Sequence, residues 1–295
     1  MYVKMATEFV NMKFTKMHGI GNDYIFVDAR NQTENWPELS QVISDRHFGI
    51  GSDGLILIHD SDKADLRMQM FNADGSEGEM CGNGLRCFVK LVIENGITDT
   101  HPESVTVETL AGILKVSPQY KGNEVKSCTV DMGFPLLNPS EIPVDLEPDW
   151  QNLEHILDYP FKTSGYDLEM SFVSMGNPHA ICFIEQPVEE FPLGDIGPEI
   201  ENHKIFPNRV NFEIVNIMNN GEMKMRVWER GSGLTLACGT GACAVAVAAR
   251  LKGLIGRDST IHLPGGPLSI SWEPSGHVYM AGPATTAFTG EFTIT

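Results

Sequence analysis

Two cysteines occupy the same place in two copies of one local pattern. The first copy is Cys81-Gly82-Asn83-Gly84 and the second is Cys238-Gly239-Thr240-Gly241. Apolar residues with helical spacing follow each copy, which predicts a helix that begins at the cysteine. Exposed backbone N–H groups and the helix dipole stabilise a thiolate at such a position. The pKa of each thiol is therefore expected to fall below its usual value of about 8.5.

A pair of such thiols is suited to proton transfer at a carbon beside a carboxylate. One cysteine, as thiolate, would remove the α-proton from one face, and the other, as thiol, would return a proton to the opposite face. The N–H groups of the two helix N-termini would stabilise the negative charge that develops on the carboxylate. The net result is inversion of the carbon. Neither a lysine motif for pyridoxal phosphate nor a phosphate-binding glycine loop is evident, so no cofactor is expected.

The alternative for each cysteine is a purely structural role. A lone cysteine at the start of a helix is usually a small buried residue, but these two share more than a motif. They lie 157 positions apart (238 − 81), and alternating strands precede them at the same offset, at residues 66–71 and 223–228. The remaining cysteines lie within apolar helix or strand patterns and are predicted to be structural: Cys87, Cys128, Cys182 and Cys243.

The repeat predicts two halves built on one plan, which would set the two thiols opposite each other. A proline-rich stretch at residues 133–148 is the best candidate boundary, and the last strand is expected to cross back to the first half. The expected division is a disordered N-terminal extension at residues 1–12, a first half at 13–132 plus 283–295, and a second half at 133–282.

Composition excludes several classes of protein. A chain of 295 residues can bury the cores of two domains, and 42% hydrophobic residues is normal for a globular protein. The net charge of −18 opposes binding to nucleic acid or to an anionic membrane. No apolar run approaches the roughly 18–20 residues that span a bilayer, and residues 1–8 have neither the basic nor the apolar region of a signal peptide. We therefore expect a cytoplasmic protein with free thiols and no metal site.

Further polar candidates lie in the loops beside the cysteines. An asparagine in a loop is usually a turn former, but four of them flank predicted strands: Asn22, Asn72, Asn177 and Asn211. Glu229-Arg230 precedes a glycine-rich loop, where the arginine would either hold a carboxylate in two hydrogen bonds or form a surface ion pair. His179 would orient a cysteine or a substrate, or serve only the local fold.

Together these segments resemble the diaminopimelate epimerase family. No single motif is decisive, but their number and order are specific, and the resemblance runs from about Lys13 to the C-terminus. The segments that carry it are Met17-His18-Gly19-Ile20-Gly21-Asn22-Asp23, Phe71-Asn72-Ala73-Asp74-Gly75-Ser76-Glu77, Cys81-Gly82-Asn83-Gly84-Leu85-Arg86-Cys87, Ser174-Met175-Gly176-Asn177-Pro178-His179, Arg209-Val210-Asn211, Glu229-Arg230-Gly231 and Ala237-Cys238-Gly239-Thr240-Gly241-Ala242-Cys243-Ala244.

The resemblance implies a pyridoxal-independent, metal-free epimerase that interconverts LL- and meso-2,6-diaminopimelate in the bacterial route to lysine and peptidoglycan. It implies an α+β fold of two pseudo-symmetric domains, each a mostly antiparallel sheet wrapped round a central helix, with the site in the cleft. It also implies a homodimer. One departure is visible, because Gly54 stands where some members of the family carry a glutamine.

The same resemblance assigns roles to residues. Cys81 and Cys238 match the acid/base pair, and His179 and Glu229 match residues that position the reacting centre. The positions that match substrate-binding residues are Asn22, Asn72, Gly82, Asn83, Asn177, Asn211, Glu229, Arg230, Gly239 and Thr240.

Two alternatives remain open. A proline or hydroxyproline racemase would use the same two-base chemistry, but its cyclic substrate has no second amino-acid head to pair with the predicted distal binding residues. From another class, the two cysteines would form a redox switch in a binding protein without catalytic activity. Proton exchange at the α-carbon of a substrate distinguishes an enzyme from such a binding protein.

Overall fold

The structure is a computed structural model that describes residues 10–219 and 221–294. The chain divides into two compact units. Unit 1 comprises residues 1–19, 23–126 and 284–295, and unit 2 comprises residues 20–22 and 127–283. The division after Lys126 falls inside strand β8 (Glu124–Asp131), whereas the sequence pattern places it at residue 133.

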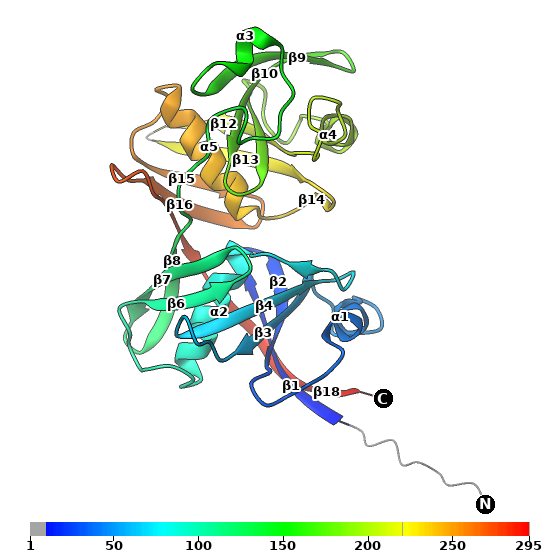
Figure 1. The fold of residues 1–295 in the computed structure, drawn as a ribbon, viewed down its shortest axis with the longest axis vertical. Helices are drawn as coiled ribbons and strands as arrows, with labels where there is room; N and C mark the ends of the chain where they lie inside the picture. Colours follow the sequence, from blue (N-terminus) through cyan, green and yellow to red (C-terminus); the bar gives the residue numbers. More distant parts are fainter. Residues whose placement is uncertain (1–9, 220, 295) are drawn as a thin grey trace, which may run out of the picture. The chain divides into compact units, whose positions relative to one another are not determined.

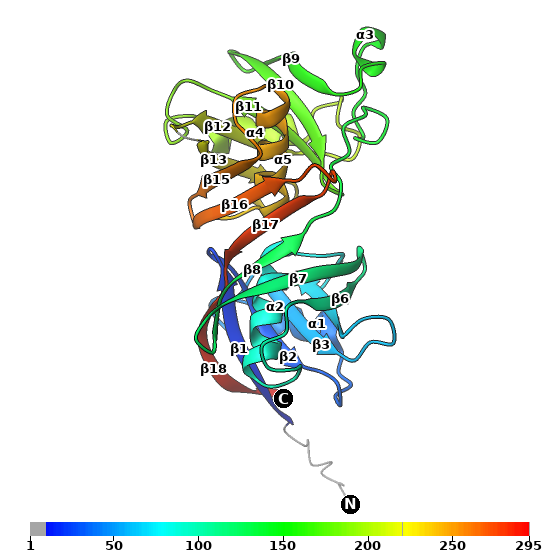
Figure 2. The same cartoon turned by 90° about the vertical axis from the view of Figure 1, so that its left-hand side faces the viewer.

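Unit 1 is a sheet that wraps round one helix (Figures 1 and 2). The order of pairing is β2–β3 parallel, β3–β4 antiparallel, β4–β6 parallel and β6–β7 antiparallel, while β1 pairs antiparallel with β18. Every residue of helix α2 from Gly82 to Ile93 is buried, so this helix is the centre of the unit. The elements are β1 (Val10–Gly19), β2 (Asn22–Asp28), α1 (Trp36–Ser44), β3 (Gly54–His59), β4 (Leu66–Asn72), β5 (Glu77–Gly78), α2 (Gly82–Glu94), β6 (Val105–Thr109), β7 (Gly112–Lys121) and β18 (Thr285–Ile294).

Unit 2 repeats this plan. Its pairings are β11–β12 parallel, β12–β13 antiparallel, β13–β15 parallel and β15–β16 antiparallel. Helix α5 is apolar and alanine-rich, and its small side chains let the strands pack closely round it. The elements are α3 (Pro148–Gln151), β9 (Ile156–Thr163), β10 (Tyr166–Ser174), β11 (Pro178–Phe183), α4 (Leu193–Glu201), β12 (Asn211–Ile217), β13 (Glu222–Glu229), β14 (Gly233–Leu234), α5 (Gly239–Leu251), β15 (Asp258–Leu263), β16 (Gly266–Trp272) and β17 (Val278–Pro283).

The central elements of the two units correspond in order and closely in length, at offsets of 155 to 157 residues. Helices α2 and α5 each have 13 residues and begin 157 positions apart, and α1 and α4 each have nine residues at the same offset. In the strand registers, Tyr24 pairs with Gly54 at the start of β2–β3, and His179 pairs with Asn211 at the start of β11–β12. Tyr24 is therefore the counterpart of His179, and Gly54 that of Asn211. The predicted α+β fold of two pseudo-symmetric domains round central helices is confirmed.

The prediction of a disordered extension is wrong for residues 10–12. These residues open β1, where Asn11 pairs with Thr293 and Met12 with Phe292, and the Met12 side chain is buried. The partner strand lies at the far end of the chain, so no local pattern reports this pairing. Residues 1–9 lie outside the described residues.

Helix α4 is an element that the sequence patterns do not predict. Gly194, Gly197 and Pro198 are poor helix formers and interrupt the apolar periodicity. The helix nevertheless buries Leu193, Ile196 and Ile200, and it packs against β13. Tertiary packing therefore outweighs the low helical propensity of this segment.

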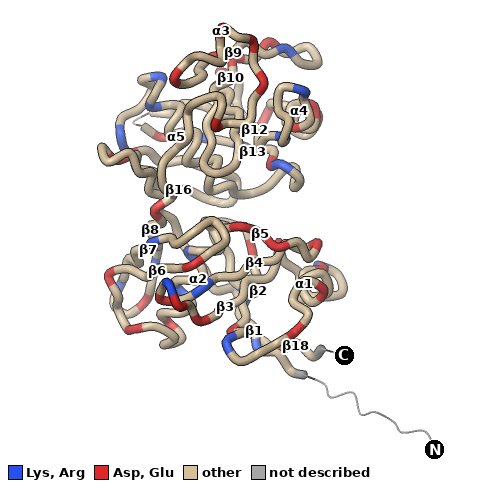
Figure 3. Tube along the Cα trace, in the orientation of Figure 1, with Lys and Arg blue, Asp and Glu red and all other residues tan. Residues whose placement is uncertain are grey.

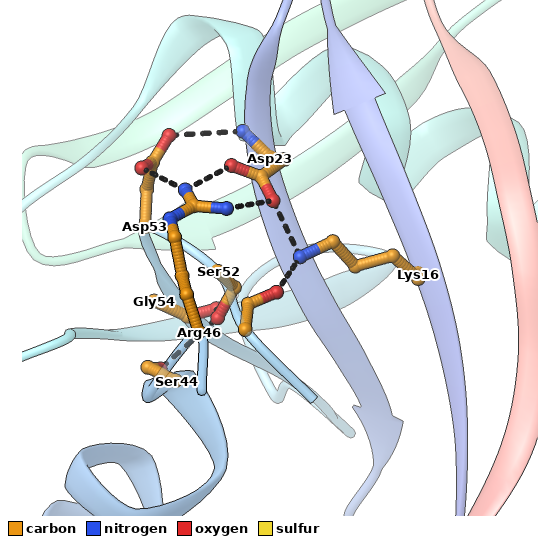
Figure 4. Close-up of polar contacts among 8 residues, drawn as sticks. Lys16, Asp23, Ser44, Arg46, Ser52, Asp53 and Gly54 are labelled. Carbon is orange, nitrogen blue, oxygen red and sulfur yellow. Dashed lines mark hydrogen bonds and ion pairs between the residues drawn. The ribbon is translucent and has the colours of Figure 1, made fainter. Parts of the chain in front are cut away.

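A charged network fixes the entry to β2 and β3 in unit 1 (Figure 4). The Asp23 carboxylate forms ion pairs with Lys16 Nζ at 2.5 Å and with Arg46 Nη2 at 2.7 Å. Arg46 also forms an ion pair with the Asp53 carboxylate at 2.8 Å. The buried Lys16 donates in addition to the carbonyl oxygen of Gly51. Burial alone would raise the pKa of Asp23, but the hydrogen bonds from Arg46 and Lys16 outweigh it and hold that pKa below its ordinary value.

Acidic residues outnumber basic ones, 39 to 21, and Figure 3 shows Asp and Glu along both units. None of the described helices is long and apolar enough to cross a membrane.

Candidate active site

Each of the two predicted cysteines is the N-cap residue of the central helix of its unit. Cys81 precedes α2, and its Sγ accepts a hydrogen bond from the Gly84 N–H at 3.4 Å. Cys238 precedes α5, and its Sγ accepts from the Gly241 N–H at 3.3 Å. Both cap residues have extended backbone conformations. The prediction that a helix begins at each cysteine is confirmed.

The second glycine of each motif lets a neighbouring strand approach the helix start. A Cβ atom on Gly241 would lie 2.7 Å from Glu213 Oε1 and 3.1 Å from Cys238 Sγ. A Cβ atom on Gly84 would lie 2.5 Å from Ile56 Cδ1. Glu213 and Ile56 are counterparts in β12 and β3, so the same space beside the helix holds a carboxyl group in unit 2 and a methyl group in unit 1.

The expectation of a lowered thiol pKa is wrong for Cys238. Burial raises the pKa of this thiol well above its ordinary value, and the nearby carboxyl groups of Glu229 and Glu213 raise it further. Hydrogen bonds from Thr240 and from the Gly241 N–H act in the opposite direction but are smaller. Desolvation and like charge therefore outweigh the helix N-terminus and favour the thiol form of Cys238.

A group of polar side chains surrounds Cys238 within unit 2. Asn177 Nδ2 donates to Thr240 Oγ1 at 3.2 Å, and Asn177 Oδ1 lies 3.1 Å from His179 Nε2. Thr240 Oγ1 in turn lies 3.6 Å from Cys238 Sγ. The structure thus brings together Asn177, His179, Thr240 and Cys238, which the sequence predicts as separate candidates.

Asn211 and Arg230 form a second part of this group. Asn211 is buried, donates to the carbonyl oxygen of Pro178 at 3.0 Å and accepts from the backbone N–H of Arg230 at 2.9 Å. The Arg230 guanidinium donates to the carbonyl oxygen of Asn208 at 3.1 Å. Among the described residues it has no carboxylate partner, so the alternative of a surface ion pair is not realised there.

Glu229 contacts the cysteine side of the same group. Its carboxyl group accepts a hydrogen bond from the Thr235 hydroxyl, and it lies close enough to Cys238 to raise the pKa of that thiol. Burial raises the pKa of Glu229, and the neighbouring Glu213 adds to this effect. A buried carboxyl group whose pKa is raised is suited to exchange a proton with a thiol.

The predicted residues of unit 1 form a smaller set. Gly82 and Asn83 are buried in the first turn of α2 beside Cys81. Asn72 ends β4, where its side chain donates to Ser76 Oγ at 2.9 Å. Asn22 begins β2 but groups with unit 2.

Gly54 is the counterpart of Asn211, and the structure explains its lack of a side chain. A Cβ atom there would lie 2.2 Å from the carbonyl oxygen of Phe71 and 3.2 Å from the Tyr24 ring. No side chain fits at this position on this backbone. This crowding accounts for a glycine at position 54.

Glu213 is the component of the site that the sequence interpretation missed. It lies in the middle of β12, is fully buried, and places Oε1 2.6 Å from His179 Nδ1. Burial raises its pKa, and the adjacent His179 partly offsets this. The available signal was a charged residue inside the apolar run Phe212–Ile217, at the position that corresponds to Ile56 in the first half.

Comparison with known proteins assigns the family. The sequence profile described as diaminopimelate epimerase matches residues 14–137 and 171–287. The chain belongs to the diaminopimelate epimerase family. The diaminopimelate epimerase of Methanococcus maripaludis is 53% identical over 285 residues, covering 96% of this chain and all of the relative. That of Acetivibrio thermocellus is 50% identical over 282 residues, covering 95% and 98%. The protein is therefore an isomerase of the epimerase type.

Solved structures show how widely the diaminopimelate epimerase fold is shared. A hydroxyproline epimerase from Agrobacterium vitis superposes with a TM-score of 0.69 at 14% identity, covering 98% of this chain and 93% of that one. A phenazine biosynthesis protein of the PhzF family from Bacillus anthracis superposes with a TM-score of 0.67 at 17% identity, covering 97% and 100%. At these identities the likeness concerns the fold.

Proposed function

We propose that the protein interconverts LL- and meso-2,6-diaminopimelate by a two-base mechanism with Cys81 and Cys238 as the bases. The observation that carries this proposal is that both cysteines cap the central helices of equivalent units in the same conformation. The family membership supplies the substrate, because the relatives that cover the whole chain bear that name.

The proposed reaction balances without a cofactor. The thiolate of one cysteine takes the α-proton, which breaks the C–H bond and leaves a carbanion beside the carboxylate. The thiol of the other cysteine then gives its proton to the opposite face of the carbon. After one turnover the two cysteines have exchanged protonation states, and the reverse reaction restores them.

In the proposed cycle Cys238 begins as the proton donor. Burial and the nearby carboxyl groups of Glu229 and Glu213 raise its pKa, which favours its thiol form. Cys81 is then the thiolate that removes the proton in the first turnover. Glu229, whose carboxyl group is near enough to raise the pKa of Cys238, would accept or supply the proton when Cys238 changes state, and His179 would position the reacting centre.

The remaining predicted residues would bind the substrate. The Arg230 guanidinium, which pairs with no carboxylate among the described residues, would hold a carboxylate of the substrate in two hydrogen bonds. The first-turn N–H groups at Gly82-Asn83 and Gly239-Thr240 would bind the carboxylate at the reacting carbon. The amide side chains of Asn22, Asn72, Asn177 and Asn211 would pair with the ammonium and carboxylate groups of the substrate.

The physiological setting follows from the same proposal. An enzyme for diaminopimelate would act in the cytoplasm, in the synthesis of lysine and peptidoglycan precursors. We propose that it works as a homodimer and needs neither a cofactor nor a metal ion.

The test compares two substrates in D₂O. The reduced protein is incubated with LL-diaminopimelate in one tube and with L-proline in another, and deuterium at the α-carbon is followed by NMR. The proposal predicts deuterated meso-diaminopimelate in the first tube and no exchange in the second. Exchange with proline alone would favour a proline racemase, whose fold is also similar. No exchange in either tube, from folded and reduced protein, would contradict the enzymatic proposal.

A further inference from the structure

A chain of hydrogen bonds in unit 2 runs from a buried carboxyl group to Cys238. Glu213 Oε1 lies 2.6 Å from His179 Nδ1, and both side chains are fully buried. His179 Nε2 lies 3.1 Å from Asn177 Oδ1, and Asn177 Nδ2 donates to Thr240 Oγ1 at 3.2 Å. The last contact joins Thr240 Oγ1 to Cys238 Sγ at 3.6 Å.

The amide of Asn177 gives this chain a direction, because it has one end that accepts and one end that donates. Its oxygen faces His179, so the Nε2 atom of His179 carries a proton. Its NH₂ group donates to Thr240 Oγ1, which leaves the hydroxyl proton of Thr240 to donate to Cys238 Sγ. A thiolate accepts such a bond more strongly than a thiol does. The chain in this direction therefore stabilises the deprotonated form of Cys238.

Glu213 is the group that can hold the proton of His179 on Nε2. A neutral imidazole has one N–H, so with the proton on Nε2 the Nδ1 atom needs a donor, and an imidazolium needs a carboxylate at the same place. A protonated Glu213 supplies the donor to Nδ1, and an ionised Glu213 supplies the carboxylate that an imidazolium needs. Among the described residues its Oε1 has His179 as its hydrogen-bond partner and its Oε2 has none. The carboxyl group is thus committed to His179.

Unit 1 shows that the fold itself does not require this pair. The counterparts of His179 and Glu213 are Tyr24 and Ile56, and Ile56 fills the space beside Gly84. A hydrocarbon side chain therefore packs in the same backbone setting. The carboxyl–imidazole pair is confined to the unit that carries Cys238.

We propose that Glu213 is a positioning residue for Cys238. It acts through His179, Asn177 and Thr240, so that the Thr240 hydroxyl donates a hydrogen bond to the Cys238 thiolate. The proposal rests on the proposed role of Cys238 as a base in one direction of the reaction. The other titratable group that faces Cys238 is Glu229 from β13. The direct effect of the Glu213 charge has the opposite sign, because a nearby carboxylate raises the pKa of Cys238 and disfavours its thiolate.

This difference in sign makes the proposal testable without turnover. Because only the thiolate is alkylated, the rate at which iodoacetamide labels Cys238 at pH 8 reports the thiolate fraction, and peptide mass spectrometry identifies the site. In Glu213→Leu the rate should fall about tenfold, as expected for the loss of one hydrogen bond to a charged sulfur. An unchanged or faster rate would overturn the proposal.

Matched variants separate the chain from a general loss of structure. Thr240→Val should slow labelling to the same extent, and Thr240→Ser, which keeps the hydroxyl, should restore it. The double variant His179→Tyr with Glu213→Ile copies the side chains of unit 1 and should also slow labelling about tenfold. If Glu213→Leu fails to fold, this double variant tests the role of the Glu213–His179 pair in its place.

Glu201→Gln serves as the control for neutralising a buried carboxyl group. Glu201 lies in α4 and is hydrogen-bonded to Trp228 Nε1 and to the Gly231 N–H, outside the chain to Cys238. In Glu201→Gln the labelling rate of Cys238 should match that of the wild type, even if the stability of the variant is lower. Equal slowing in Glu201→Gln and Glu213→Leu would show that the effect is not transmitted by the chain, and would overturn the proposal. None of these readouts depends on the identity of the substrate.

Discussion

The two units share a backbone plan but place their charged side chains differently. In unit 1 the entry to the central parallel strands carries Asp23 and Asp53, which are held by Lys16 and Arg46 (Figure 4). The corresponding positions in unit 2 are Pro178 and, 157 residues after Asp53, Val210, so no such network can form there. Ion pairs hold the entry to the central parallel strands in unit 1. In unit 2 apolar packing and the hydrogen bonds of Asn211 hold the corresponding segments.

Beside the central helix the arrangement is reversed. Unit 1 has Tyr24 and Ile56 there, whereas unit 2 has the buried pair His179 and Glu213. The helix-capping cysteine is thus common to both units, and its electrostatic surroundings are not. Repetition of the fold supplies two equivalent thiols, and Cys238 lies in the unit that has His179 and Glu213 at the positions of Tyr24 and Ile56.

The largest expected effect is the loss of either cysteine. Cys81→Ala and Cys238→Ala should each lower kcat by about 10²–10⁴-fold, the usual contribution of a general acid or base, while circular dichroism and thermal unfolding stay close to the wild type. Cys87→Ala and Cys243→Ala remove buried thiols from the same two helices and should keep turnover. If either Cys81→Ala or Cys238→Ala kept the wild-type rate, the equivalence of the two thiols in the mechanism would be wrong.

The second effect concerns the charged network that only unit 1 contains. Lys16→Met should lower the free energy of unfolding by about 3 kcal/mol, because it removes one partner of a buried ion pair and leaves Asp23 with Arg46 alone. Urea unfolding at pH 7 measures this. The pKa of Asp23 is lowered in the folded state, so its contribution is present above its unfolded pKa near 3.8 and is lost as the pH falls through the folded value. The difference between variant and wild type should therefore shrink in acid, and a constant difference would argue against the ion pair.

The third effect compares the counterpart positions 54 and 211. Gly54→Ala should cost about 1–3 kcal/mol of stability, because its Cβ would clash with the carbonyl oxygen of Phe71. Asn211→Gly should cost a similar amount through the loss of its hydrogen bonds to Pro178 and Arg230, and it should also weaken substrate binding. Thermal unfolding and KM distinguish the two. A raised KM in Gly54→Ala with unchanged stability would contradict the assignment of position 54.

The smallest effect is a change in the pH dependence of stability. Burial raises the pKa of Glu229 in the folded state, so the stability associated with its protonated form is present below its unfolded pKa of 4.5 and is lost as the pH rises towards the folded value. Glu229→Gln removes this loss, so the variant should gain stability relative to the wild type between pH 5 and pH 8. Urea unfolding at both pH values tests it, and a gain of the wild type over the variant across this range would show that Glu229 is not desolvated.

Local sequence patterns were sufficient to predict the helix-capping cysteines and the alternating strands. Cys81 and Cys238 each sit in a motif whose glycines and following apolar residues specify a helix start within a few residues. The asparagines of the site and Arg230 could also be predicted as candidates, because they lie next to the ends of predicted strands. These features depend on neighbours in the sequence, and the repeat doubled the signal for each of them.

Features that depend on distant contacts were not predictable in the same way. The pairing of residues 10–12 with β18 joins the two ends of the chain. In the sequence, Glu213 looks like an ordinary polar residue of a strand. Only the structure shows that its carboxyl group lies beside His179 and in the space that the absent side chain of Gly241 leaves open. The raised pKa of Cys238 has the same origin, because the helix-terminus argument omits the burial and the two carboxyl groups that the fold adds.

The most direct test of the two-base mechanism follows the label early in the reaction. LL-diaminopimelate is converted to a few per cent in D₂O, and deuterium at the α-carbon is measured in both the recovered substrate and the meso product. If one cysteine removes the proton and the other returns one, the meso product carries deuterium and the recovered LL isomer does not. Equal labelling of both isomers at low conversion would mean that a single base serves both faces, and it would contradict the proposed division of roles between Cys81 and Cys238.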